Sequence, residues 1–293
     1  MKRLIVIITA TLLLFACNSN QKQTENRDGK KVITVSIVPE KTFVQKIAGD
    51  DFEVNVLVPP GASPASYTLL PSQLKDIANS VIWFRIGYIG FEYSWKDKIE
   101  QANPNMKVVD LSEGLDLIAE ETEQHGDHIH VNGVDPHIWL SPGLVKKMAQ
   151  RITAELTELN PEKGPEYKVN YLKFVKEIDQ LHIQIKNRLK EVQGKKFIVF
   201  HPSLTYFARE YGLEQYSLEE GGKEPTPQHL AKMVDLANKE NIKVIYIQSE
   251  FDREHARVFA EEIKGEVVQV RPLDPAWAEN LLEITQILVD NFE

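Results

Sequence analysis

The sequence predicts an α/β protein of two lobes, each a mostly parallel sheet flanked by helices, joined by one long rigid helix. Two observations predict this architecture. Short apolar, β-branched runs alternate with helical patterns in both halves of the 293-residue chain, which is typical of parallel sheets covered by helices. Between the halves lies one amphipathic stretch that is longer than a single small domain needs.

The first half carries the pattern of an N-terminal lobe, which we expect over residues 31–150. Residues 32–38 are apolar and β-branched and end at Pro39, so they predict a buried strand. Residues 120–133 are polar and predict a loop. The other expected strands and helices of this lobe are strands 52–58, 81–84 and 108–109, and helices 42–48, 74–78 and 144–159.

The joining helix lies in a linker region that we place at residues 151–193. Apolar residues recur at spacings of three and four from Tyr167 to Leu189, with no Gly or Pro before Gly194. At 1.5 Å per residue, about 28 residues span about 40 Å. The helix is therefore expected to bridge two lobes.

The α/β pattern then restarts and predicts a C-terminal lobe over residues 194–293. Its strands and helices are expected at residues 197–200, 244–247 and 267–270, and at 228–238, 253–263 and 277–291, respectively.

Composition limits the function classes. The chain has 34 Lys+Arg against 43 Asp+Glu, a formal charge of -9, and 42% hydrophobic residues, which is ordinary for a soluble globular protein. No block of positive charge is present, so nucleic acid binding is disfavoured, because that binding begins with neutralisation of phosphates. A cationic ligand remains compatible with this charge.

The N-terminus predicts export. Lys2 and Arg3 precede the apolar residues 4–15, a run too short to cross about 30 Å of hydrocarbon, so residues 1–16 are expected to be a signal peptide. The single cysteine, Cys17, follows in Leu-Phe-Ala-Cys, which resembles a bacterial lipoprotein box and implies a lipid anchor on Cys17. The alternative is a cleaved signal with an incidental cysteine. Residues 17–30 are polar and predict a flexible tether, so we expect an extracytoplasmic protein anchored to a bacterial membrane.

Histidine placement suggests metal binding, because neutral imidazole is a common metal ligand. His201 follows the strand predicted at 197–200, and open α/β sheets bind ligands beyond the carboxyl ends of their strands. His137 is a second candidate ligand. A possible auxiliary set lies in the acidic loop, where a short His-rich tract suits Zn²⁺; its members are His125, His128 and His130. His182, His229 and His255 fall on predicted helices beside charged residues and are expected to be solvated.

No compact catalytic motif is present. The sequence lacks His-Glu-x-x-His, Gly-x-Ser-x-Gly, a phosphate loop and a dinucleotide fingerprint, so we expect no enzyme. One enzyme alternative stays open, a secreted metal-dependent hydrolase that uses His137 and His201 with Glu250 as general base.

Several motifs, in the right order between about Val32 and Leu288, resemble those of the zinc- and manganese-binding proteins of metal ABC importers. The best match is Asp-Pro-His-Ile-Trp-Leu-Ser-Pro at residues 135–142, which corresponds to the family's second motif along the chain. The others are Gly-Ala-Ser-Pro at 61–64, Tyr67, Pro-Ser-Gln at 71–73, Phe-His-Pro at 200–202, Tyr-Phe at 206–207, Tyr-Gly-Leu at 211–213 and Glu-Pro-Thr-Pro at 224–227.

The resemblance implies two lobes on a rigid helix, a small closing motion, and a divalent metal held between the lobes for delivery to an ABC permease. Zinc is expected from the ligand types and the His-rich loop, with Mn²⁺ possible. His137 and His201 stand at two of the family's ligand positions. Ala65 stands where the family has a histidine, and Arg271 where it has a carboxylate, unless Asp274 fills that place through a shifted alignment.

Three explanations for the missing ligands stay open. Other groups replace them, with Glu250 the first candidate and Glu40, His128 or His130 behind it. Alternatively, two strong ligands and water bind the metal more weakly. In the third explanation the cleft has lost metal and binds an anion through Arg271 and Arg85. A degenerate site in an adhesin or scaffold is a further alternative, and a monomer is expected throughout.

Overall fold

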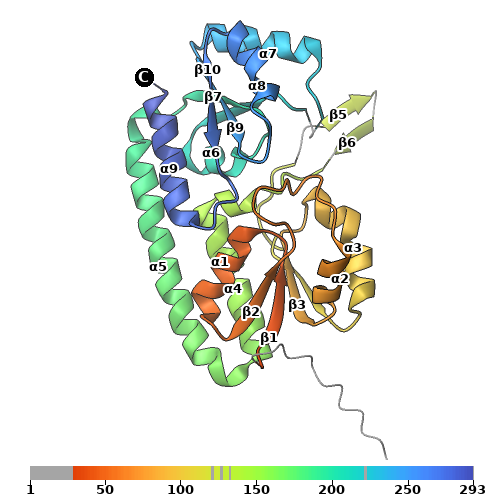
Figure 1. The fold of residues 1–293 in the computed structure, drawn as a ribbon. Helices are drawn as coiled ribbons and strands as arrows, with labels where there is room; N and C mark the ends of the chain where they lie inside the picture. The colour runs from red at the N-terminus through yellow and green to blue at the C-terminus, as the bar shows by residue number, and fades with distance from the viewer. Residues whose placement is uncertain (1–28, 120–121, 126–127, 132, 221–222, 293) are drawn as a thin grey trace, which may run out of the picture.

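The computed structural model describes residues 29–292 apart from 120–121, 126–127, 132 and 221–222. Cys17 and the predicted signal peptide and most of the tether therefore lie outside the described residues. Two four-stranded parallel sheets form the centres of two lobes, one above the other in Figure 1. None of the helices within the described ranges is long and apolar enough to cross a membrane.

The first lobe has the strand order β2-β1-β3-β4. Its strands are β1 (Lys31–Val35), β2 (Phe52–Val56), β3 (Ser80–Arg85) and β4 (Lys107–Asp110), and its helices are α1 (Val38–Ala48), α2 (Pro71–Ile77), α3 (Gly90–Ala102) and α4 (Pro142–Leu159). The strand predicted at 32–38 ends earlier, because Pro39 stands in the first turn of α1, where a missing N–H costs no helical hydrogen bond. Sequence reasoning missed α3, which buries only a narrow stripe of side chains.

The second lobe has the strand order β10-β9-β7-β8. Its strands are β7 (Lys196–Val199), β8 (Glu214–Ser217), β9 (Val244–Gln248) and β10 (Glu266–Val270), and its helices are α6 (Thr205–Tyr211), α7 (Pro227–Lys239), α8 (Glu254–Glu262) and α9 (Trp277–Asp290). The sequence did not predict α6 or β8. The latter is an edge strand of only 4 residues with no fully buried position, so it lacks an apolar alternation.

The predicted long helix is confirmed as α5 (Gly164–Arg188). Its 25 residues span about 37 Å, and it runs along one side of both lobes in Figure 1. It packs against α1 and α4 of the first lobe and α9 of the second. The predicted apolar positions face these helices, with Phe174, Ile178 and Leu181 all buried. The described residues also form short 3₁₀ turns at Ile138–Leu140, Pro161–Lys163 and Lys190–Val192.

The prediction of a loop over residues 120–133 was wrong in its described part. These residues form an antiparallel hairpin of β5 (Thr122–His125) and β6 (His128–Val131), in which His125 pairs with His128. Strand pairing uses backbone groups, so a polar sequence can form it without an apolar face. In Figure 1 the hairpin lies on the opposite side of the molecule from α5.

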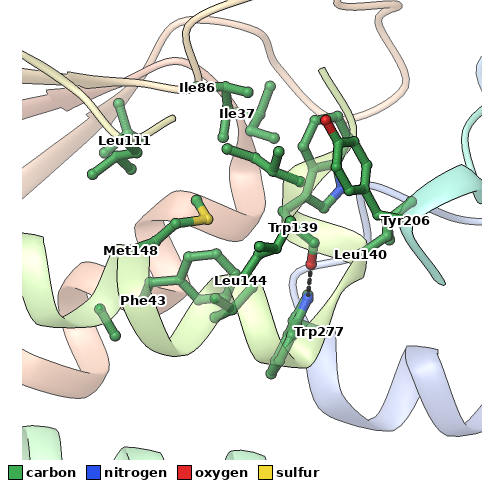
Figure 2. Packing of buried hydrophobic residues seen from close by; sticks show 14 of the residues in the cluster. Ile37, Phe43, Ile86, Leu111, Trp139, Leu140, Leu144, Met148, Tyr206 and Trp277 are labelled. Atoms are coloured by element: carbon green, nitrogen blue, oxygen red, sulfur yellow. Dashed lines mark hydrogen bonds between the residues drawn. The ribbon is translucent and has the colours of Figure 1, made fainter. Parts of the chain in front are cut away.

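The two lobes share one apolar core on the side of α5. In Figure 2, Trp277 of α9 donates its Nε1–H to the carbonyl oxygen of Trp139, at 2.7 Å. The Trp139 Nε1–H in turn reaches the carbonyl oxygen of Pro272 at 2.9 Å. The Tyr206 hydroxyl donates to the Asp135 carbonyl at 2.8 Å. Because these buried aromatic side chains have their polar atoms paired, the 135–140 segment is held firmly between the lobes.

Candidate metal centre

A cavity of about 540 Å³ lies between the lobes, and residues of both lobes line it. The first lobe contributes Ala65 and the aromatic residues Tyr88 and Tyr93, while the 135–140 segment contributes His137 and Trp139. From the second lobe come His201, Pro202, Gln248, Glu250, Phe251, Pro272 and Leu273. All three metal ligands proposed from the sequence therefore face the same cavity.

His137 is held by a carboxylate two residues before it. Its ring Nδ1 lies 2.9 Å from Asp135 Oδ1, and the same oxygen accepts the His137 backbone N–H at 2.8 Å. Because an ionised carboxylate only accepts hydrogen bonds, Nδ1 carries the proton and Nε2 keeps a lone pair for a metal. Burial, the largest cause, lowers the pKa of His137, so the ring stays in the neutral form that a metal ligand requires.

His201 has the same arrangement in the second lobe. Its Nδ1 lies 2.6 Å from Glu219 Oε2, and its ring stacks on Phe251 with centroids 5.5 Å apart. Both the His201 and the Glu219 side chains are largely buried. The carboxylate again leaves Nε2 as the free nitrogen. Each lobe therefore supplies one oriented imidazole.

The two imidazole rings lie at a separation that suits one metal ion. The centroids of His137 and His201 are 5.2 Å apart, with an interplanar angle of 73°. A tetrahedral zinc ion with Zn–N bonds of about 2.0–2.1 Å would place two imidazole centroids about 5 Å apart. The separation of the two rings is thus compatible with one ion bound between them.

Sequence reasoning assigned no role to the two carboxylates that orient these rings. Asp135 was visible only as part of the 135–142 motif, where its spacing to His137 is the one available signal. Glu219 is 18 residues from His201, and nothing in the sequence connects them. Sheet pairing of β7 with β8 brings the segments that follow these two strands together.

Glu250 lies in the cavity wall but does not complete a three-ligand cluster. Among the His, Cys, Asp and Glu side chains that the structure describes, no group of three or more is close enough to hold a metal ion. Glu250 accepts a hydrogen bond from the Ser249 hydroxyl at 2.9 Å, and burial raises the pKa of its carboxyl. Two histidines with a nearby carboxylate are therefore what the described residues offer.

Ala65, the position of one absent family ligand, does face the cavity. Its loop lies against the first turn of α3, where a Cβ on Gly90 would come within 2.7 Å of the Ala65 carbonyl oxygen. Glycine at position 90 permits this close approach. Ala65 therefore lies in the wall of the same cavity as His137 and His201.

Arg271 and Arg85, the two residues expected to bind an anionic ligand, do not line the cavity. Arg271 is half exposed and pairs with Glu283 at 2.6 Å and Asp274 at 3.5 Å, away from the cavity lining. Arg85 pairs with Asp110 at 2.6 Å. Of the cavity-lining residues in the described ranges, none is Lys or Arg. These pairings contradict the third explanation for the missing ligands, and the carboxylate of Asp274 is engaged by Arg271 instead of facing a metal.

Glu40 was also wrongly proposed as a ligand. It is fully buried beneath the start of α1, where its Oε2 accepts the backbone N–H groups of Ser36 and Ile37, each at 2.9 Å. The Glu40 carboxylate therefore accepts hydrogen bonds from the backbone N–H groups at the N-terminus of α1 and does not face the cavity.

The remaining histidines differ from expectation in part. His182 pairs with Glu210 at 3.0 Å, and His229 Nε2 lies 2.9 Å from the Ser217 carbonyl oxygen. The prediction that these two rings are freely solvated is therefore wrong. His255 is exposed. For His125, His128 and His130 the structure describes the hairpin backbone and not the side chains, so their proposed auxiliary role is untested.

The chain is similar to known zinc-uptake proteins. The family described as the periplasmic zinc-uptake complex component A matches residues 33–292. The high-affinity zinc uptake system protein ZnuA of Bacillus subtilis is 29% identical over 92% of this chain and 88% of its own length. The zinc-binding lipoprotein AdcA of Streptococcus pneumoniae is 26% identical over 96% of this chain, which spans only 57% of that relative.

Solved structures extend the comparison. A crystal structure of ZnuA matches with a TM-score of 0.84 and 36% identity, covering 90% of this chain and 100% of that one. A zinc-bound deletion mutant of ZnuA matches equally well. The periplasmic zinc-binding protein TroA of Treponema pallidum, at 16% identity and a TM-score of 0.78, supports the fold alone. These are metal-binding transport proteins and not enzymes, so the hydrolase alternative is not supported.

Proposed function

We propose that this chain, which belongs to the periplasmic zinc-uptake complex component A family, binds zinc between its lobes and delivers it to an ABC importer. The observation that carries the proposal is the pair of imidazoles from opposite lobes, with centroids 5.2 Å apart and each oriented by a carboxylate. A carboxylate on the far nitrogen of a metal-ligating histidine fixes the ring and raises its basicity.

Zinc is favoured over manganese by the ligand types. Imidazole suits zinc, whereas manganese prefers more oxygen donors. His137 and His201 would bind the ion, with Glu250 at the third position when the lobes close around it. Relatives described as a zinc uptake system protein and as a zinc-binding lipoprotein support the same assignment.

Closure around the ion should be small. The core that includes Phe43 and Met148 of the first lobe continues to Trp277 and Leu281 of the second, and α5 packs on both. Opening the lobes widely would expose part of this shared core, at about 25 cal/mol per Å² of apolar surface. Capture and release would therefore involve a small rotation about the α5 side.

The N-terminal residues support an extracytoplasmic location. The protein would be exported by the signal peptide at 1–16 and held at a bacterial membrane by a lipid on Cys17, with residues 17–30 as a tether. We place the first lobe at 31–150, the linker region at 151–193 and the second lobe at 194–293. It would act as a monomer beside its permease.

Calorimetric zinc titration of metal-stripped protein, from residue 24 onward, tests the proposal. One zinc per chain should bind tightly, and His137→Ala and His201→Ala should each remove most high-affinity binding. His182→Ala is the matched control, because its imidazole pairs with Glu210 instead of lining the cavity.

A deletion of residues 121–130 separates the hairpin from the two main ligands. High-affinity binding should survive it largely intact. Loss of binding equal to that of the histidine variants would show that the hairpin supplies a main ligand, and an absence of binding in the parent protein would overturn the proposed function.

A further inference from the structure

Two buried glutamates support the first-lobe side of the cavity. Glu40 and Glu92 are both fully buried, and they stand in the first turns of α1 and α3, respectively. These helices follow β1 and β3, which are neighbours in the first-lobe sheet. Because the carboxyl ends of parallel strands share one edge of a sheet, the two carboxyl groups lie within electrostatic range of each other.

Glu92 holds the loop between β3 and α3 with both of its carboxylate oxygens. Its Oε1 accepts the backbone N–H of Ile86 at 2.8 Å, and its Oε2 accepts that of Gly87 at 2.7 Å. The residues that follow, 88–90, line the cavity, and so does Tyr93. The Glu92 carboxylate therefore fixes the backbone from which this part of the cavity wall begins.

The first turn of α3 also supports a second segment of the wall, residues 63–65. The Phe91 N–H donates to the Pro64 carbonyl oxygen at 3.0 Å, and Gly90 allows the Ala65 backbone to approach closely. Since Glu92 belongs to this same turn, its interactions affect both segments of the first-lobe wall.

The carboxyl groups of this cluster have little positive charge beside them. Arg85 of β3 lies 3.8 Å from Glu92 but pairs more closely, at 2.6 Å, with Asp110 of β4. The buried Oε1 of Glu40 has no hydrogen-bond partner among the described residues. The hydroxyl of Tyr93, on α3 itself, also faces the cluster. Three carboxyl groups thus share one cation, and buried like charges favour protonation of at least one of them.

The two glutamates hold protons differently. Burial, followed by the charge of Glu92, raises the pKa of Glu40 well above its ordinary value, so Glu40 is neutral at neutral pH. Its Oε2 accepts two backbone N–H groups, which leaves Oε1 to carry the proton. Burial also raises the pKa of Glu92, to about 7, although its hydrogen bonds and Arg85 oppose the rise. Glu92 is therefore the member of the pair that changes charge near neutral pH.

Protonation of Glu92 would weaken its hold on the loop. A carboxylate accepts hydrogen bonds at both oxygens, whereas a carboxylic acid carries a hydrogen on one of them. The N–H of either Ile86 or Gly87 would then lose its charge-assisted acceptor. A zinc ion in the cavity has the opposite effect, because a nearby cation favours the ionised form of a carboxyl group.

We propose that Glu92 is a pH-sensitive positioning residue, whose ionised form holds the first-lobe wall in the geometry that binds zinc. This inference rests on the proposed function and adds regulation of the same site. Zinc binding and proton release from Glu92 are then linked, so that zinc affinity rises with pH through the range in which Glu92 ionises.

The ratio of the zinc Kd of Glu92→Gln to that of the parent, measured by chelator competition from pH 6 to 8, tests the inference. Glutamine has an N–H₂ in place of one acceptor oxygen, so it imitates the protonated acid. The ratio should be about ten at pH 8 and fall to about two at pH 6, where the parent is largely protonated at Glu92. Protonation of His137 and His201 affects both proteins and cancels in the ratio.

Two variants are matched controls. Glu40→Gln keeps an acceptor oxygen for its two backbone N–H groups and places N–H₂ where the neutral acid carries its proton, so its zinc Kd should stay within twofold of the parent at every pH. Glu155→Gln should behave in the same way, because Glu155 pairs with Lys107 and does not line the cavity. Melting temperatures verify the folding of each variant.

Carbon-13 NMR of the parent protein, labelled at its glutamate carboxyl groups, needs no variant at position 92. One carboxyl signal that is retained in Glu250→Gln should titrate near pH 7 in metal-free protein. With zinc bound, its midpoint should lie about one pH unit lower, which is the shift that a tenfold coupling requires.

The outcomes separate this inference from the proposed function. A Kd ratio that is independent of pH, or a carboxyl signal that titrates identically with and without zinc, overturns the role of Glu92 and leaves the zinc carrier standing. A Glu40→Gln ratio that changes with pH as that of Glu92→Gln does also overturns it. An absence of zinc binding by the parent at pH 8 overturns both proposals.

Discussion

Replacement of Glu219 by glutamine removes one charge from behind the metal ligand with little change in shape. Glu219 Oε2 lies 2.6 Å from His201 Nδ1, and its side chain is 10% exposed. The amide oxygen of glutamine can still accept the Nδ1–H, so the ring keeps its orientation. The substitution lowers the basicity of the His201 ring and removes a negative charge that would stabilise the bound cation.

The expected magnitude follows from the distances. Across the imidazole ring and a Zn–N bond of about 2.0 Å, the carboxylate is about 6–7 Å from the ion. A unit charge and a dication at that distance interact by about 1–5 kcal/mol, for effective dielectric constants of about 80 to 20. Outer-shell substitutions typically cost 10–100-fold in metal affinity, or about 1.4–2.8 kcal/mol, so we expect Glu219→Gln to weaken zinc binding by that factor.

Competition against a chromophoric zinc chelator at pH 7.5 measures this change. The matched control is Glu210→Gln, because Glu210 also pairs with a histidine, His182, at 3.0 Å but does not line the cavity. The control should keep zinc affinity within twofold. Zinc binding by Glu219→Gln within twofold of the parent, while His201→Ala loses it, would refute the orienting role of Glu219.

Three further predictions concern single positions. Ala65→His should tighten zinc binding at least tenfold, about 1.4 kcal/mol, by adding a third imidazole, and an unchanged Kd in chelator competition would contradict this. Arg271→Ala should leave the zinc Kd within twofold, since Arg271 pairs with Glu283 outside the cavity lining; a tighter Kd would place its charge near the metal. Burial raises the pKa of Glu92 from 4.5 to about 7, so the folded state binds a proton more tightly than the unfolded state. The free energy of unfolding should therefore fall by at most about 3 kcal/mol as pH rises from about 4.5 to 7, and urea unfolding of Glu92→Gln should show a flatter pH profile.

The sequence predicted much of the fold because the signals are local. The apolar spacing from Tyr167 to Leu189 follows the helical period and identified α5, and β-branched runs identified strands such as β9. Elements with few buried side chains, such as β8 and α3, carry too weak a pattern to be recognised. The hairpin β5-β6 was missed for a related reason, since its pairing depends on backbone groups.

The sequence by itself determined the α/β architecture and the two histidines, because their motifs and their places relative to strand ends can be recognised along the chain. Only the tertiary structure decided which other residues share the site. It brought Glu219 to His201 across a sheet, placed Glu40 under a helix, and paired Arg271 with Glu283. Such contacts depend on how strands pair and how two lobes pack over a common core, and local spacing does not specify either.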